Sequence, residues 1–256
     1  MAYEKVLKSC IIAALFASFA ALSLAEEPAT PEELFIRGNS YYEKGEYEKA
    51  ISEYEKILAN GYESGPVYYN IADAYFKSGK LGKAILNYKR AKRIMPRDAD
   101  LAANYKFAMA NVQAKIEPKR GVWAWRPIRI YATSFTINEL TLLASGMYVA
   151  IMVLIFIAAV RPGRNGYLKM AIILVSVCFA INTAILWGKV NWVRSGAVVT
   201  ASRAEALFGP FDSATKFFTL HEGVSVSILK SKDDWYKVRR ADGKVGWIQK
   251  TTVERI

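Results

Sequence analysis

The chain has 256 residues, with 35 Lys and Arg against 23 Asp and Glu, and a formal net charge of +12 at pH 7. Such a length exceeds one small core and suits two small domains together with membrane segments. Nucleic acid is a poor partner for this charge, because residues 26–116 are nearly neutral, with 14 basic and 13 acidic side chains. The excess lies beside apolar segments and near the C-terminus, where it suits anionic lipid headgroups.

The first 25 residues have the three parts of a secretory signal: a positive start, an apolar run over 11–24 and small residues before the expected cleavage point. A third spanning helix is the alternative. The run would reach only about 21 Å as a helix, short of a hydrocarbon core of about 30 Å. We therefore predict a signal peptide over 1–25, cleaved after Ala25. Cleavage removes Cys10, so no intramolecular disulfide is expected.

A repeat of 34 residues follows, because residues 31–64 match residues 65–98 in size and chemistry at several positions. The matched pairs are Leu34 with Tyr68, Gly38 with Ala72, Tyr41 with Tyr75, Gly45 with Gly79, Ala50 with Ala84, Ile51 with Ile85 and Tyr54 with Tyr88. Each unit reads as helix, glycine turn and helix, with small residues where the helices cross. The period and pattern resemble the tetratricopeptide repeat, and Pro96 closes the second unit as in that family.

One more helix is predicted over 99–115. Its apolar stripe consists of Leu101, Tyr105, Ala108 and Val112. This helix would cap the array, whose open end otherwise exposes apolar surface. A tetratricopeptide repeat domain is therefore expected over 31–116.

A juxtamembrane linker is predicted over 117–139. Residues 117–137 are expected to be irregular, because Pro118, Gly121 and Pro127 interrupt any helix. Aromatic side chains alternate there with arginines, and this mixture suits the headgroup zone of a membrane. Stacking on nucleic-acid bases is the alternative, but the apolar segments nearby favour lipid.

Two transmembrane helices are predicted, at 140–160 and 170–188. Their uncharged runs would span about 31 and about 27 Å as helices, which is enough to cross a bilayer. The loop 161–169 carries three positive charges, which favours a cytoplasmic location. Asn182 and Thr183 are polar residues in the second span, where an interhelical hydrogen bond is favoured over a functional intramembrane site.

The two spans also predict the topology. An even number of spans returns the chain to the side from which it started. With an export signal, that side is outside the cytoplasmic (inner) membrane of a bacterium. The repeats and the C-terminal domain are therefore both predicted to be extracytoplasmic or periplasmic.

Short alternating strands and turn signals fill residues 195–256, and Asp242-Gly243 is a hairpin signal. Five or so strands in this length predict a small all-β barrel. The run from Leu220 to Ile248 resembles the bacterial SH3-like domain. That family reads Val-Arg-x-Gly-Pro at the segment that here reads Ala-Leu-Phe-Gly-Pro over 206–210, so no ligand role is assigned to the missing arginine.

No catalytic, metal-binding or cofactor-binding residue is predicted. His221 is the only histidine and has no second histidine or cysteine beside it for a metal. Asp233 and Asp234 read as a solvated turn rather than an acid/base pair. Neither a serine-hydrolase motif nor a glycine-rich phosphate loop occurs, so we do not expect an enzyme.

The first helix of each repeat is predicted to line a concave, protein-binding face. The residues assigned to it are Phe35, Asn39, Tyr42, Tyr69, Asn70, Asp73, Phe76 and Lys77, with Glu43 beside them. Asn39 and Asn70 have the spacing of two asparagines that hold a terminal carboxylate in peptide-binding tetratricopeptide domains. The cation positions of that clamp are occupied here by Phe35, Asp100 and Asn104. A peptide or helix held by aromatic and amide contacts is therefore the hypothesis, and packing between helices is the alternative for each residue.

Two further features bear on binding. Residues 31–64 carry a net charge of −4 and residues 65–98 one of +6, a polarity that would orient a charged partner. In the β-domain, Trp235, Tyr236 and Trp247 form a candidate face for a peptide or glycan. The alternative is that the two tryptophans support the core.

The order of the whole chain is similar to that of the BatE family of the bacterial aerotolerance operon, including the run Asp-Ala-Asp-Leu-Ala-Ala-Asn-Tyr over 98–105. The resemblance implies partners among von Willebrand factor A-type membrane proteins and a MoxR-type ATPase, in envelope stress or protein maturation. We therefore expect a non-enzymatic, membrane-anchored scaffold that binds proteins and membrane lipid but not nucleic acid. A peptidoglycan-binding tether or regulator of cell-wall machinery is the alternative.

Overall fold

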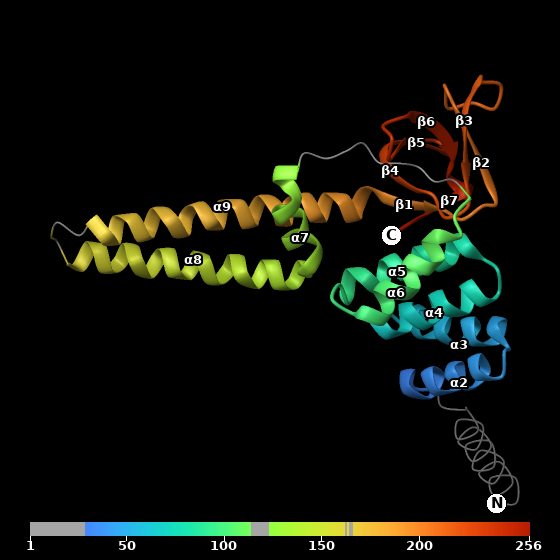
Figure 1. Cartoon of the computed structure of the whole chain (residues 1–256), viewed down its shortest axis with the longest axis horizontal. Coiled ribbons are helices and arrows are strands. Elements are labelled where there is room, and N and C mark those ends of the chain that lie inside the picture. The colour runs from blue at the N-terminus through green and yellow to red at the C-terminus, as the bar shows by residue number, and fades with distance from the viewer. Residues whose placement is uncertain (1–28, 114–122, 162, 164–165) are drawn as a thin grey trace, which may run out of the picture.

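A computed structural model of the chain describes residues 29–113, 123–161, 163 and 166–256. The predicted signal peptide over 1–25 lies outside the described residues. A stack of short helices and a β-domain lie side by side at the same end of a long helical hairpin (Figure 1).

The helical stack begins with two helix pairs and ends with a fifth helix. These helices are α2 (Pro31–Glu43), α3 (Tyr47–Ala59), α4 (Gly65–Lys77), α5 (Leu81–Ile94) and α6 (Ala99–Ala110). Thr30 and Glu33 form a reciprocal capping box that fixes the start of α2. A Cβ on Gly38 would lie 2.4 Å from the Tyr54 ring, so the close helix crossing expected from the sequence requires this glycine.

Helix α6 covers the end of the stack but is shorter than the predicted 99–115, because it ends at Ala110. The side chain of Asn111 donates to the Phe107 carbonyl at 2.9 Å and thereby satisfies a carbonyl of the last turn. Leu101 and Ala108 are fully buried, and Val112 is buried just beyond the helix.

The segment over 117–137 was expected to be irregular. Residues 117–122 lie outside the described residues, and for most of 123–137 the expectation is wrong. Residues Trp123–Trp125 form a 3-10 turn (η1), and Arg126–Ser134 form helix α7. Pro127 does not break α7, since it lies in the first turn, where a helix needs no N–H donor. Helix α7 lies across the hairpin (Figure 1).

The hairpin consists of α8 (Ile137–Val160) and α9 (Gly166–Ser195), both long and apolar enough to cross a membrane. Asn182 is buried and donates from Nδ2 to the Leu140 carbonyl oxygen at 3.0 Å, which is the interhelical hydrogen bond expected from the sequence. Asn182 Oδ1 also accepts from the Tyr131 hydroxyl of α7 at 2.9 Å.

Both hairpin helices are longer than the predicted spans of 140–160 and 170–188. Helix α8 begins earlier because Thr136 caps it. Helix α9 begins inside the predicted loop 161–169 and continues past its apolar part to Ser195. Its extension lies against the repeats, where the Lys89 ammonium of α5 is 5.8 Å from the centroid of the Trp192 ring.

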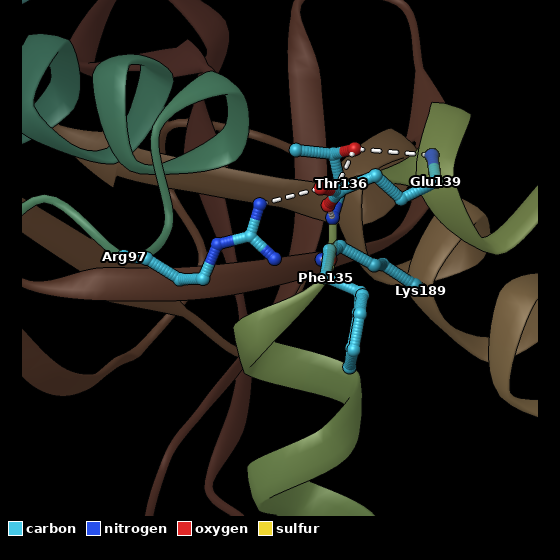
Figure 2. A network of polar contacts seen from close by, with 5 residues as sticks. All are labelled: Arg97, Phe135, Thr136, Glu139 and Lys189. Atoms are coloured by element: carbon cyan, nitrogen blue, oxygen red, sulfur yellow. Dashed lines mark hydrogen bonds and ion pairs between the residues drawn. The ribbon is translucent and has the colours of Figure 1, made fainter.

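A polar network joins the repeats to the start of the hairpin (Figure 2). Arg97 Nη2, just after α5, contacts Glu139 Oε1 at 2.5 Å. The other Glu139 oxygen accepts from the Thr136 backbone N–H at 2.8 Å. Lys189 of α9 donates to the carbonyl oxygens of Ala132, at 2.9 Å, and of Phe135.

The β-domain is one antiparallel sheet in the order β3-β2-β6-β5-β4-β1-β7. Its strands are β1 (Gly196–Val199), β2 (Arg203–Leu207), β3 (Lys216–His221), β4 (Ser225–Lys232), β5 (Trp235–Arg240), β6 (Val245–Gln249) and β7 (Val253–Arg255), with a 3-10 turn η2 (Lys250–Thr252). Seven strands exceed the expected five or so, and the shortest of them, β7, has only three residues and so gives no clear alternation. Gly243, at φ 93°, forms the predicted hairpin turn.

The predicted fold class is confirmed: a helical tetratricopeptide-like array, two apolar helices and an antiparallel SH3-like sheet make up the described chain. Helix α5 packs against β1, and buried residues of the array and of the β-domain form one continuous core. Arg90 of α5 donates from Nη2 to the Arg255 carbonyl at 2.7 Å. Helix α9 passes into β1 without an intervening residue. The β-domain is therefore fixed to both the hairpin and the repeats.

Candidate functional site

A small pocket opens on the face formed by α2, α3 and α4. Its volume is about 150 Å³, and it is lined by Asn39, Tyr42, Glu43, Tyr54, Asn70 and Asp73. All but Tyr54 come from the first helix of a repeat. The 34-residue period places these helices side by side, and this arrangement brings together side chains that are distant in the sequence.

The two asparagines of the pocket are bound to each other. Asn39 Oδ1 accepts from Asn70 Nδ2 at 3.0 Å and from the Tyr54 hydroxyl at 2.6 Å. Because one amide oxygen is shared by two donors, the side chains of both asparagines are held in one orientation. The Tyr54 hydroxyl is protonated at neutral pH and can act as this donor, and burial raises its pKa to about 12.

Asp73 adds a carboxylate to the lining of the pocket. It accepts from the Tyr88 hydroxyl, and Asn104 Nδ2 lies 3.4 Å from both of its oxygens. Burial raises the pKa of Asp73, while the hydrogen bonds from Tyr88 and Asn104 act against that shift. Asn104 also donates to the Tyr69 hydroxyl at 2.7 Å. Helices α5 and α6 therefore hold this carboxylate from behind.

The structure places four of the eight predicted concave-face residues in the pocket, namely Asn39, Tyr42, Asn70 and Asp73. The other three predicted aromatic residues, Phe35, Tyr69 and Phe76, pack against aromatic rings of neighbouring helices and do not line the pocket. The ring centroids are 5.8 Å apart for Phe35 and Tyr54, 6.2 Å for Tyr69 and Tyr88, and 5.6 Å for Phe76 and Phe107. Lys77 is exposed and does not line the pocket. Tyr54 was not predicted to line the pocket, although its match with Tyr88 identified it as an aromatic position that both repeats share.

In the β-domain, the three predicted face residues do not form one platform. Lys237 pairs with Trp247 across β5 and β6, and Tyr236 pairs with Ile248. Because side chains alternate along a strand, Trp235 and Trp247 share one face and Tyr236 lies on the other. Trp235 is 8% exposed, while Trp247 is half-buried beneath the Lys237 ammonium, at 5.9 Å from the ring centroid.

Among residues 29–113, 123–161, 163 and 166–256, no group of three or more His, Cys, Asp or Glu side chains is arranged to hold a metal ion. His221 is the last residue of β3, and Asp233, at φ 47°, lies in the β4–β5 turn. The lining of the pocket consists of hydrogen-bonding and charged groups on a rigid helical frame, which suits binding.

Comparison with known families supports the same division of the chain. Residues 31–60 and 65–98 match the tetratricopeptide repeat, and residues 201–254 match the bacterial SH3 domain. A search of curated proteins finds no match to the chain. Domains of both kinds are typically non-catalytic interaction modules. The chain is therefore a multidomain protein with a tetratricopeptide repeat array and a bacterial SH3-like domain, joined by two helices that can span a membrane.

Proposed function

We propose that this protein is a non-enzymatic scaffold, anchored in the bacterial inner membrane with both soluble domains on the outer side. The main support for this proposal is that the repeat array, which contains the pocket, is packed against the β-domain and linked to the hairpin. Helix α9 enters β1 directly, and α5 packs on that strand. A partner bound by the repeats would therefore be held at a defined position above the membrane.

We further propose that its partners are von Willebrand factor A-type membrane proteins linked to a MoxR-type ATPase, as in a BatE-like envelope stress or aerotolerance complex. The order of the segments supports this assignment. The test is crosslinking in cells, detergent extraction and affinity capture of the tagged full chain. We expect von Willebrand factor A-type proteins among the captured partners. Their absence after efficient crosslinking would contradict the assignment.

The topology can be tested by labelling single cysteines in a Cys178→Ser background. Ser52→Cys in α3 and Ser213→Cys in the β2–β3 loop report on the two soluble domains, and Gly163→Cys reports on the hairpin loop; all three positions are exposed. In intact spheroplasts, a membrane-impermeant maleimide should label the first two variants and leave the third unlabelled until lysis. The reverse pattern would place both domains in the cytoplasm and refute the proposed localisation.

A second candidate function is peptidoglycan binding through the SH3-like domain. It is favoured by the family match over 201–254 and by the half-buried Trp247 beside Lys237. The test is sedimentation of the detergent-solubilised full chain with purified sacculi. We expect Trp247→Ala to reduce the sedimented fraction more than Trp187→Ala, which changes an exposed tryptophan of α9. A wild-type chain that stays wholly soluble would exclude this function.

A further inference from the structure

The pocket between α2, α3 and α4 is of a size that suits one side chain of a partner. Its volume is about 150 Å³. Small-molecule sites are usually larger, at roughly 300–1,000 Å³. The following inference rests on the proposed scaffold function and names the chemistry of the group that the repeats would accept.

The pocket combines negative charge with aromatic surface. Asp73 and Glu43 contribute carboxylates, and Tyr42 and Tyr54 contribute rings and hydroxyls. Tyr42 is held in an edge-on contact with Tyr47, with ring centroids 5.3 Å apart. None of the described residues that line the pocket is Lys, Arg or His. A group that enters would therefore meet negative charge without a compensating cation in the lining.

The charge of Asp73 also acts on the neighbouring tyrosine hydroxyls. Burial is the main cause of the raised pKa of Tyr42, and the charge of Asp73 raises it further. For Tyr69, burial and then the charges of Asp73 and Asp100 raise the pKa to about 12. Lys77, on the same helix as Asp73, is the nearby cation that opposes this negative charge, but it is exposed and so its charge is screened by solvent.

The carboxylate of Asp73 is pre-positioned by the fold. Tyr88 and Asn104 hold it from behind, and the paired amides of Asn39 and Asn70 form the adjoining wall. Binding to a group that is already oriented costs less conformational entropy than binding to a mobile side chain. A guanidinium or ammonium would gain a charge-assisted hydrogen bond to this carboxylate and a contact with a tyrosine ring.

We infer that this pocket accepts an Arg or Lys side chain from an extended segment of a partner protein. Asp73 is the primary acceptor, Glu43 supplies a second charge at the exposed rim, and Tyr42 contacts the apolar stem or the cation. The occupant is a positively charged side chain because the lining provides carboxylates, an amide oxygen and rings in one small hollow.

The inference is tested with pools of octapeptides that are acetylated at one end and amidated at the other. Four pools carry Arg, Lys, citrulline or Glu at the fixed central position, and the other positions are randomised. The full chain is held in neutral phosphatidylcholine nanodiscs, and retained peptides are measured by mass spectrometry. We expect the Arg and Lys pools to be retained about tenfold or more over the citrulline pool, which has the shape of Arg without its charge.

Variants link this preference to the pocket. Glu43→Gln changes an exposed side chain, so folding is preserved, and it should reduce retention of the Arg pool about tenfold; Asp73→Asn should reduce it further. Glu48→Gln is the matched control, because Glu48 is an exposed acid of α3 outside the pocket. Equal retention of the Arg and citrulline pools, retention of no pool, or equal loss in Glu48→Gln would overturn the inference.

The same variants separate this inference from the scaffold function itself. If wild type and both pocket variants capture von Willebrand factor A-type proteins equally well from crosslinked cells, the pocket assignment fails and the scaffold stands. If wild type captures none, the proposed function fails regardless of the peptide result. Capture that is lost in Glu43→Gln and retained in Glu48→Gln supports both.

Discussion

The backbone N–H of Gly82 in the second repeat donates to Glu222 Oε1 in the β-domain, at 2.7 Å, although 140 residues separate the two. Helix α5 has no side-chain cap of its own, because Lys80 occupies its N-cap position. Glu222 therefore acts as the cap from another domain, where a carboxylate is favoured by the positive end of the helix dipole. This contact joins the repeats to the β-domain at the start of α5.

We expect Glu222→Ala to loosen the start of α5 and to destabilise the full chain by about 1–2 kcal/mol, since both a helix cap and an interdomain contact are lost. Hydrogen exchange of the α5 amides and thermal unfolding in detergent measure these effects. Glu205→Ala is the control, because Glu205 is an exposed acid of the same domain whose ion pair with Lys216 should contribute little. Unchanged exchange in Glu222→Ala would contradict the capping role.

Gly82 itself should tolerate no side chain. A Cβ at this position would lie 2.6 Å from the Val199 carbonyl oxygen and 2.9 Å from Thr200 Cα, both of which are backbone atoms. Gly82→Ala should therefore separate the two domains and cost about 1–3 kcal/mol. Gly188→Ala has open space around its Cβ within helix α9 and should be neutral or slightly stabilising. Equal unfolding temperatures for the two variants would refute this account of the interface.

Features that depend on local sequence were predictable. The 34-residue period identified both repeats, and it placed Asn39, Tyr42, Asn70 and Asp73 on one face, where the structure finds the pocket. The helix α7 was missed because Pro127 was read as a breaker, although the first turn of a helix accepts proline. Helix α7 could have been predicted if proline had been allowed in the first turn of a helix.

Contacts between distant segments were not predictable in the same way. Tyr54 belongs to the second helix of its repeat, and its hydroxyl donates a hydrogen bond to Asn39 of the first helix. The approach of Gly82 to Val199 depends on how two folded domains dock, and nothing in the local pattern of either segment reports it. The separation of Tyr236 from Trp235 and Trp247 follows from strand register, which one sequence specifies weakly.

The hydrogen bond from Asn182 to the Leu140 carbonyl should stabilise the hairpin. Asn182→Leu removes this bond and the acceptor for Tyr131, so we expect a loss of about 0.6–2 kcal/mol. Unfolding of the full chain by a titration of sodium dodecyl sulfate in mild detergent measures it. Thr183→Val alters the adjacent exposed residue and should have a smaller effect. If Thr183→Val is as destabilising as Asn182→Leu, the interhelical bond is not the cause.

Lys89 should make the stability of the chain depend on pH. Burial, and then the charge of Lys92, lower the pKa of Lys89 in the folded chain to about 8 from 10.5. Between these two pH values the unfolded chain binds more protons than the folded chain. The free energy of unfolding should therefore rise as the pH increases from 8 to 10.5. Below pH 8 both states are protonated, and the cost of burying the charge is present in full.

Replacing Lys89 should remove that dependence. We expect Lys89→Met to be more stable than wild type by about 1–3 kcal/mol at pH 7, with the difference vanishing above pH ~10.5. Denaturant unfolding across this pH range is the measurement, and Lys106→Met, at an exposed position of α6, is the control. A constant difference between wild type and Lys89→Met at every pH would show that the charge of Lys89 is not responsible.

Lys189 performs at the end of α7 the role that Glu222 performs at the start of α5. Its ammonium donates to the carbonyl oxygens of Ala132 and Phe135, which lie where a helix leaves carbonyls unsatisfied and its dipole is negative. Lys189→Met keeps the apolar stem but loses the donors, so α7 should fray from its C-terminal end and its contact with α9 should weaken.

Hydrogen exchange of residues 131–135 in detergent measures this fraying, and we expect at least about tenfold faster exchange in Lys189→Met, equivalent to about 1.4 kcal/mol. Arg194→Met removes a positive charge five residues further along α9, at an exposed position, and should leave these amides unchanged. Because the two variants lose the same charge, a shared acceleration would assign the effect to the charge of α9 as a whole. An effect confined to Lys189→Met assigns it to the two carbonyl contacts that hold α7 across the hairpin.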